Sequence, residues 1–349
     1  MMKALVIEKD FSYSLKDVPI PTFGEYQALV KIEASAVCGT DLKILHGEFS
    51  SFPDYPTILG HEAVGIVVEV GAKVKNFSVG ERVLHPILYE ETGGYYSTFG
   101  AMAEYAVVED YEAIKSDGVP VDDVVNHEHF EVGLIQFKIP QQFEPVSATM
   151  IITFTEVFST FKRANLKKGQ SLVVYGLGPV GQVLISLCRL VGMKSIVVVR
   201  RAEKAQLAEQ LGADIVIDSS LVDPVQEVHR HLPDGVDAIW DAAGVTDVIN
   251  IGLKMIKPFG KIIMYGVMAD TSYLIDWKGA PLSFDLIFTQ WPDIGDIVDC
   301  FDEIIEMMSD NRLNGMDFIS DIMPFDRAVE GIDMFLERRN KQKIVFTFP

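Results

Sequence analysis

The chain has 349 residues, of which 48% are hydrophobic and 23% are charged, a composition typical of a globular protein with a sizeable core. Its 30 lysine and arginine residues against 50 aspartate and glutamate residues give a formal net charge of −20 at pH 7. This charge repels phosphate backbones and anionic lipid surfaces, so the composition argues against nucleic acid and membranes as partners. The length favours two domains.

Two further features bear on the location of the protein. The first residues, MMKALVIEKD, reach acidic side chains too early for a secretory signal peptide, and no stretch approaches the roughly 18 uncharged apolar residues that a membrane span needs. We therefore expect a soluble cytoplasmic protein. Cys38, Cys188 and Cys300 lie far apart and form no CxxC pair. Neither a disulfide framework nor a cysteine-only zinc site is therefore expected.

Residues 1–140 contain short β-like runs separated by Gly, Pro and Asn; the runs are KALVI, ALVKIEA, AVGIVVEV, ERVL and AEYAVV. This pattern predicts a barrel-like or sandwich β domain. Residues 109–131 are acidic and weakly periodic, so we expect a long loop or insertion there. His127, Glu128 and His129 in this loop could bind a metal ion, but alternate residues of an extended chain point in opposite directions, which favours a solvated loop face.

After Pro140 the pattern changes, because β-like runs alternate with segments of helical length. The runs are SLVVYG, SIVVVR, DIVID, AIWDAAG and KIIMYGV. This alternation predicts a parallel, doubly wound α/β sheet. The final run, KIVFTF, is expected to return to the first domain. We therefore assign residues 1–150 and 290–349 to a β-rich domain and residues 151–289 to the doubly wound domain.

A glycine-rich turn follows the first apolar run of this second domain. Gly176, Gly178 and Gly181 in SLVVYGLGPVGQ have the G-x-G-x-x-G spacing. Such glycines allow a tight turn, a close approach to a pyrophosphate, and close packing of helix on strand. The diphosphate then lies at the start of the helix, where Pro179 and Val180 follow the second glycine. The alternative is a tight turn that binds no ligand.

The end of the next strand indicates which cofactor is bound. An NAD site usually carries an acidic residue there, which hydrogen-bonds the ribose hydroxyls. In SIVVVRRAEK the corresponding positions hold Arg200 and Arg201, whose guanidinium groups can pair with a phosphate. We therefore expect NADP(H) rather than NAD(H). The alternative is a solvated charge pair, although arginine at the start of a helix opposes the helix dipole.

Residues 58–68, ILGHEAVGIVV, place two adjacent ionisable side chains, His61 and Glu62, at the start of an apolar run. Together with VCGTDLKILHGEF at 37–49, with GLGPVGQ, and with NFSVGERV, FGAMAEYAVV, GVDAIWDAAG and FGKIIMYGV, this stretch resembles the zinc-dependent medium-chain dehydrogenase/reductase family. That family includes alcohol, polyol and threonine dehydrogenases. The resemblance extends nearly from end to end, and the order of several distinct motifs makes it specific.

The resemblance implies a GroES-like β-rich catalytic domain, a Rossmann domain, and one catalytic zinc ion. Cys38 and His61 are the implied ligands, with Glu62 as an additional and sometimes exchanging ligand. Thiolate and imidazole suit Zn²⁺, and a divalent cation would neutralise a buried thiolate and carboxylate that lack other partners. The alternative makes Cys38 a small core residue and His61–Glu62 an internally hydrogen-bonded pair.

A further zinc ligand is where the sequence departs from the family. Members usually place Cys, Asp or Glu at the start of the helix that precedes the Rossmann strand, but this position is Ile152. Glu156 lies one helical turn later on the same face, and is expected either to replace this ligand or to be a surface or cofactor-facing acid. Glu144 in EPVSA resembles the polyol dehydrogenase ligand motif but lies eight residues too early.

The family's structural zinc ion needs four closely spaced cysteines after GERV. This chain has HPILYEETGGYYSTFG there, so we expect no structural zinc and instead expect tyrosine and phenylalanine packing to hold the segment. In the implied proton relay, Thr40 matches the hydroxyl that contacts the substrate oxygen. Lys43 occupies the position of the usual relay histidine, and His46 follows three residues later. Asp41 is expected to cap a turn.

These features predict hydride transfer between NADP(H) and a secondary alcohol, polyol or sugar-derived hydroxyl, or the matching ketone, in a cleft between the two domains. The alternatives are a zinc-free quinone- or enoyl-type reductase and a non-catalytic NADP(H)-binding sensor. Residues 109–131 and 289–296 are expected to shape the substrate pocket. Trp291 in the second segment could stack on a sugar or pack in the core, and core packing is the more frequent role of such a residue. The resemblance also implies a homodimer or homotetramer joined at the Rossmann sheet edge, with residues 261–267 as the candidate strand.

Overall fold

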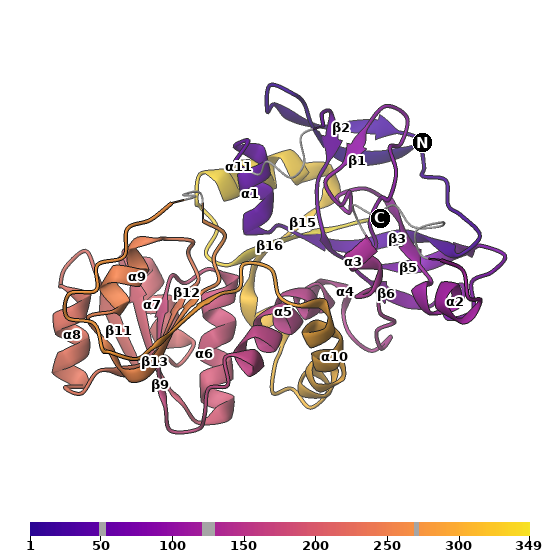
Figure 1. Ribbon diagram of the computed structural model, residues 1–349. Coiled ribbons are helices and arrows are strands. Elements are labelled where there is room, and N and C mark those ends of the chain that lie inside the picture. Colours follow the sequence, from indigo (N-terminus) through magenta and orange to yellow (C-terminus); the bar gives the residue numbers. More distant parts are fainter. Residues whose placement is uncertain (49–53, 121–129, 269–271) are drawn as a thin grey trace. The chain divides into compact units, whose positions relative to one another are not determined.

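A computed structural model describes residues 1–48, 54–120, 130–268 and 272–349 (Figure 1). The chain forms two compact units: one comprises residues 1–153 and 303–349, the other residues 154–302. The chain returns from the second unit to the first between residues 302 and 303, within helix α10 (Ile294–Ser309). The boundary predicted from the sequence, between residues 289 and 290, lies just before this helix. Within the described ranges, no helix combines the length and apolar character needed to cross a membrane.

The first unit is built on two β-sheets. One has the strand order β2-β1-β4-β7, and the other has the order β15-β16-β3-β5-β6, with β8 paired to β3. Their strands are β1 (Met2–Ile7), β2 (Tyr13–Val18), β3 (Gln27–Ala36), β4 (Thr57–Ile58), β5 (Glu62–Val70), β6 (Arg82–Leu84), β7 (Tyr96–Ser97), β8 (Tyr105–Glu109), β15 (Ile319–Pro324) and β16 (Lys343–Thr347). The predicted β-rich domain is confirmed.

Alternating side chains of β1 enter two different cores, as the two-residue period of a strand requires. Ala4 and Val6 pack with residues of β3, β5 and β6, whereas Leu5 and Ile7 pack with α1 (Gly39–Leu45), α11 (Ala328–Leu336) and β16. Strand β16 pairs with β15 and with β3, so the predicted return of KIVFTF to the first domain is confirmed. Strand β16 therefore lies in the same sheet as β3, the strand that ends two residues before Cys38.

The segment predicted to be a long loop is partly helical. Helix α2 (Tyr111–Ser116) begins after Asp110, whose side chain accepts a hydrogen bond from the N–H of Ala113 and caps the helix. The loop prediction for 109–131 is therefore wrong over α2, because this capping signal was overlooked. His127, Glu128 and His129 lie outside the described residues.

The remaining helices of this unit are short, apart from α5, which continues into the second unit. They are α3 (Phe130–Gly133), α4 (Pro145–Ala148), the 3₁₀ turns at Gly315–Phe318 and Phe325–Arg327, and α5 (Met150–Arg163). The segment after GERV is held by aromatic packing, as predicted: Tyr89 and Phe99 are buried together with Ile87. The Tyr89 hydroxyl also donates a hydrogen bond of 2.7 Å to Gln136.

The second unit contains a six-stranded parallel sheet in the order β11-β10-β9-β12-β13-β14. Its strands are β9 (Ser171–Tyr175), β10 (Lys194–Val199), β11 (Ile215–Asp218), β12 (Val236–Asp241), β13 (Ile256–Met264) and β14 (Asp285–Phe288). The predicted doubly wound sheet is confirmed. Strand β13 pairs on both sides, so residues 261–267 do not supply the sheet edge as predicted; the edge on this side is β14.

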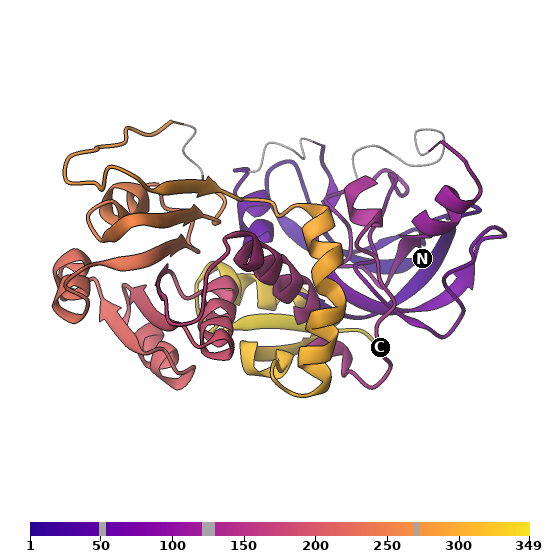
Figure 2. The ribbon, with the colours of Figure 1, turned by 60° about the horizontal axis from the view of Figure 1, so that its bottom comes forward.

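Helices cover both faces of this sheet, as Figure 2 also shows. They are α6 (Pro179–Val191), α7 (Ala202–Gln210), α8 (Pro224–His231) and α9 (Asp247–Gly252). Val197 and Val199 of β10 pack with residues of α6 and α7, whereas Ile196 and Val198 pack with residues of α8 and α9. Because helices cover both faces, successive residues of strands β9 to β12 can be apolar, without the alternation of apolar and polar residues seen in a half-exposed strand.

Candidate metal centre and cofactor site

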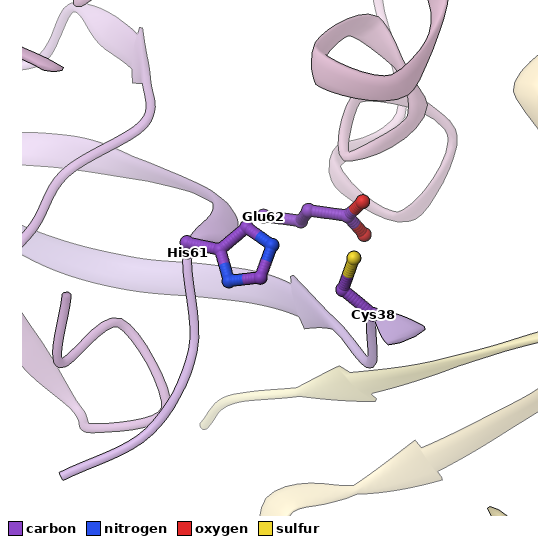
Figure 3. Close-up of side chains that lie close together, drawn as sticks. All are labelled: Cys38, His61 and Glu62. Carbon is purple, nitrogen blue, oxygen red and sulfur yellow. The ribbon is translucent and has the colours of Figure 1, made fainter. Parts of the chain in front are cut away.

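Three side chains that can ligate a metal ion meet in the first unit: Cys38, His61 and Glu62. One donor atom of each lies within 4.8 Å of the others, and no other such group of three exists among the described residues. Figure 3 shows the Cys38 thiol close to the Glu62 carboxylate, with the His61 ring beside them. The structure therefore brings together three of the four predicted ligands.

The antiparallel register of β3 and β5 creates this cluster. Ala36, the last residue of β3, pairs with Glu62, the first residue of β5. Cys38 lies two residues after Ala36 and immediately before α1. His61 directly precedes Glu62. A strand end, a helix start and a strand start therefore meet at one point, which the spacing of these residues in the sequence does not reveal.

Asp41 joins the cluster through two interactions and is completely buried. One carboxylate oxygen accepts a 2.8 Å hydrogen bond from the backbone N–H of Cys38, and the other lies 3.8 Å from Nδ1 of His61. Burial raises the pKa of Asp41, and the nearby His61 opposes this shift. Asp41 therefore holds the turn before α1 and also places a carboxylate oxygen beside the His61 ring.

Glu62 has a partner that the sequence analysis missed. Its side chain forms an ion pair with the ammonium group of Lys343, and its other oxygen accepts a 3.0 Å hydrogen bond from the hydroxyl of Thr153. Lys343 and Glu62 are both almost completely buried. The expectation that Glu62 would be buried unpaired without a metal ion is therefore wrong, since a buried lysine from β16 already carries the opposite charge.

The donor set fits a zinc ion. Burial, together with Glu62, raises the pKa of the Cys38 thiol, and Lys343 only partly offsets this; a cation bound to sulfur would favour the thiolate. His61 Nδ1 is buried and without a hydrogen-bond partner in the described part of the chain, and it faces Asp41. A carboxylate at this ring nitrogen leaves Nε2 for a metal, the usual arrangement of a zinc-ligating histidine.

The glycine-rich turn of the second unit fits a dinucleotide. Gly176 has a φ of 95°, and a Cβ atom on Gly181 would lie 2.1 Å from the Gly176 carbonyl oxygen. A Cβ on Gly178 would instead meet no atom within 4 Å, so the backbone there faces open space. Pro179 and Val180 form the first turn of α6, where N–H groups lack partners within the helix.

This turn lies at the reversal point of the sheet. Strand β9 is flanked by β10 on one side and by β12 on the other, so the chain winds in opposite directions from it. Dinucleotides bind at such switch points, beyond the carboxyl ends of the strands. Beyond β10, Arg200 and Arg201 are exposed. The pKa of Lys204 is lowered, mainly by burial of its ammonium group and secondly by the positive charge of the nearby Arg201. Three cations therefore gather at the end of β10.

Comparison with known proteins identifies the family of this chain. The model of the alcohol dehydrogenase GroES-like domain matches residues 24–120, and the model of the zinc-binding dehydrogenase matches residues 179–285. An alcohol dehydrogenase of Geobacillus stearothermophilus is 31% identical over 286 residues, which cover 76% of this chain and 77% of that protein. The chain belongs to the zinc-dependent medium-chain dehydrogenase family. It is therefore an oxidoreductase of the alcohol and polyol dehydrogenase type.

Two further matches are similar to this chain, one in sequence and one in fold. The D-arabitol-phosphate dehydrogenase of Enterococcus avium is 26% identical over 269 residues, which cover 74% of this chain and 73% of that protein. The crystal structure of 2R,3R-butanediol dehydrogenase from Bacillus subtilis superposes with a TM-score of 0.80 and 21% identity, covering 99% of both chains. That structure is similar in fold over the full length of this medium-chain dehydrogenase.

The other residues predicted to act in catalysis or proton transfer lie in or at the end of helix α1, which follows Cys38. The Thr40 hydroxyl is 3.9 Å from the Cys38 sulfur, in the first turn of α1, and Lys43 lies in the same helix. His46 is half exposed and lies 3.8 Å from Glu48. The catalytic roles of Thr40 and Lys43 stay predictions.

The group of three donor residues does not include either candidate for the further ligand. Glu156 lies in α5 within the second unit and is not part of the three-residue group, so its role as a ligand stays a prediction. Glu144 is exposed at the start of α4 and also lies outside the group. Ile152, at the position of the usual family ligand, is buried.

Asp241, at the end of β12, is a second buried acid that the sequence analysis did not single out. Its carboxylate accepts hydrogen bonds from the backbone N–H groups of Ala243, Gly244 and Val245. These bonds fix the loop that follows β12, next to the glycine turn: the nearest atom to a Cβ placed on Gly176 is the Cβ of Ala243. The signal was available, because an acid two to four residues before a glycine-containing turn commonly binds its N–H groups.

Proposed function

We propose that this chain transfers a hydride between NADP(H) and a secondary alcohol or polyol, or the matching ketone, in a zinc-dependent reaction. The observation that carries the proposal is that donor atoms of Cys38, His61 and Glu62 lie within 4.8 Å of one another, where His61 and Glu62 are buried and Cys38 is partly exposed. When bound, zinc polarises the substrate oxygen and the nicotinamide accepts or donates the hydride.

The residues of the chain have separate roles in this proposal. Cys38 and His61 hold the metal, and Asp41 orients both through the Cys38 N–H and the His61 ring. The Thr40 hydroxyl binds the substrate hydroxyl and holds its proton, which Lys43 on the next turn of α1 relays to solvent. Glu156 is proposed as a further ligand.

The proposed preference for NADP(H) depends on the cations after β10. Arg200 and Arg201 are exposed, and Lys204 follows on the first turn of α7. The sequence has no acidic residue between Val199 and Arg201, so nothing there competes with a phosphate for the guanidinium groups. The zinc-binding and nicotinamide-binding character belongs to the family, whereas the choice of NADP(H) is part of this proposal.

The proposed substrate class combines the site with the relatives. The similarity to an arabitol-phosphate dehydrogenase and, in fold, to a butanediol dehydrogenase supports a secondary hydroxyl as the reacting group. The donor cluster supports the same chemistry, since a Lewis-acidic metal held by Cys38 and His61 would polarise the oxygen of a hydroxyl or carbonyl group. A cytoplasmic location stays a prediction.

We also propose a homodimer joined at the edge of the second unit's sheet. Strand β14 is the outermost strand on its side, and large apolar side chains near it are exposed: Phe259, Trp277 and Leu282. A second copy that pairs β14 with β14 would cover both the open strand edge and these side chains. A tetramer would need a further interface.

A metal and cofactor assay tests the proposal. The purified protein is expected to contain about one zinc ion per chain and to oxidise C4–C6 polyols or simple secondary alcohols with NADP⁺ more efficiently than with NAD⁺. Cys38→Ser is expected to lose both zinc and turnover, whereas Cys188→Ser, at a buried cysteine of the other unit, is the control. Turnover in fully metal-free protein would indicate a zinc-free reductase, and cofactor binding without turnover would indicate a sensor.

A further inference from the structure

Lys343 is a buried cation close to the proposed zinc site. It is the first residue of β16, and its side chain is only 1% exposed. A lysine removed from water in this way is destabilising unless an opposite charge pairs with it. Its partner is Glu62, whose side chain is 3% exposed and which lies 281 positions earlier in the sequence.

Both oxygens of the Glu62 carboxylate are already bound by the chain. One oxygen pairs with the Lys343 ammonium group, and the other accepts the 3.0 Å hydrogen bond from Thr153. The same carboxylate nevertheless has an oxygen within 4.8 Å of the Cys38 and His61 donor atoms. Glu62 is therefore close enough to reach a metal ion, but two groups of the protein hold it.

A metal ion and Lys343 compete for the same carboxylate charge. If Glu62 moved onto the metal, the ammonium group of Lys343 would stay buried with a weakened partner, which is costly in a medium of low polarity. With Glu62 held by Lys343, the metal keeps fewer protein ligands and one more open position. Catalytic zinc sites require such an open position for substrate.

We propose that Lys343 is a positioning residue that keeps Glu62 off the zinc ion, so that the coordination position within reach of Glu62 stays open for the substrate oxygen. The inference rests on the proposed zinc-dependent function. Thr153 assists by holding the second carboxylate oxygen. Glu62 is then an exchangeable zinc ligand, and the ion pair with Lys343 of β16 controls whether it binds the metal.

The test compares Lys343→Met, which removes the charge, with Lys343→Arg, which keeps it. Each protein is stripped of metal and reconstituted with Zn²⁺ or Co²⁺, and the metal affinity is measured by competition with a chelator. Lys343→Met is expected to bind Zn²⁺ about 10-fold more tightly or better, because Glu62 becomes a full ligand, and its Co²⁺ d–d bands should weaken as a ligand is added. Lys343→Arg should restore the wild-type affinity and spectrum.

Two controls assign the effect to Glu62. Adding Glu62→Gln to Lys343→Met should abolish the gain in affinity. Lys257→Met breaks a different ion pair, with Asp237 at 3.0 Å in the second unit, and should leave the metal affinity unchanged. If circular dichroism shows that Lys343→Met does not fold, Thr153→Val replaces it, and should raise the affinity about 3-fold by freeing one oxygen of Glu62.

The outcomes separate this inference from the proposed function. Wild-type protein that binds neither Zn²⁺ nor Co²⁺ would overturn the zinc-dependent function and the inference with it. Wild-type protein that binds zinc, together with a folded Lys343→Met variant of unchanged or weaker affinity and unchanged Co²⁺ spectrum, would overturn the inference alone. Lys343 would then serve only to neutralise Glu62 in the folded chain.

Discussion

The first and third glycines of the G-x-G-x-x-G turn are tightly packed, whereas the second faces open space that the proposed dinucleotide would occupy, and two alanine substitutions can separate these roles. In Gly181→Ala the new Cβ would lie 2.1 Å from the Gly176 carbonyl oxygen, although real Cβ atoms essentially never come closer than 3.0 Å. Helix α6 would have to move from β9 by roughly 1 Å. Overpacking of this kind costs about 1–3 kcal/mol.

This cost predicts a measurable loss of stability. For a unit of this size, 1 kcal/mol shifts the midpoint of thermal unfolding by about 2–4 °C, so Gly181→Ala should lower Tm by about 2–12 °C. Its affinity for NADPH should also fall, because the N–H groups at the start of α6 move with the helix. Differential scanning calorimetry and NADPH fluorescence titration measure the two effects.

Gly178→Ala is the matched substitution. Gly178 has a φ of −75°, and its added Cβ would meet no atom within 4 Å. The lost preference for glycine at a helix N-cap and the reduced entropy of the unfolded chain are each below about 1 kcal/mol and have opposite signs. Tm should therefore change by less than about 2 °C.

Binding should respond differently from stability in Gly178→Ala. The methyl group would occupy the space into which a pyrophosphate must come, so NADPH affinity should fall about 10- to 100-fold, the loss expected for a charged hydrogen bond. The reasoning is refuted if Gly181→Ala keeps the wild-type Tm, or if Gly178→Ala binds NADPH as tightly as the wild type.

Three further predictions follow from the same structure. Replacing Arg200 and Arg201 by serine should raise KM for NADP⁺ about 10- to 100-fold while leaving KM for NAD⁺ within about 3-fold, as steady-state kinetics would measure; an equal loss with both cofactors would contradict the phosphate-binding role. Leu282→Asp should convert the proposed dimer to a monomer in light scattering, because a charge would replace a fully exposed apolar side chain beside the open sheet edge; a stable dimer would place the interface elsewhere. Burial raises the pKa of Glu109 from its ordinary 4.5 to about 7. The folded chain therefore keeps a proton that the unfolded chain releases, and the free energy of unfolding should fall by roughly 2–3 kcal/mol as the pH rises from 4.5 to 7. Glu109→Gln, which cannot ionise, should lose this contribution, and urea denaturation at pH 5 and pH 8 would detect it as a smaller difference between the two pH values than in the wild type.

Local patterns in the sequence were enough to predict the two folds, whereas the candidate metal ligands were predicted from the resemblance to the family. Alternating apolar residues predicted the β-rich unit, and apolar runs between helical segments predicted the parallel sheet, because these periods reflect which faces are buried. The spacing of Gly176, Gly178 and Gly181 follows from the sterics of one turn. The missing cysteines after GERV predict, from the sequence alone, that the family's structural zinc site is absent.

The arrangement around Glu62 could be found only in the tertiary structure. Lys343 reaches Glu62 because β16 and β5 both flank β3 in one sheet, and no local spacing records that adjacency. The edge role of β14 likewise depends on the strand order. Motifs report interactions within a turn, a strand or a helix, whereas a buried charge pair depends on the register between distant strands, which is set when the whole sheet packs.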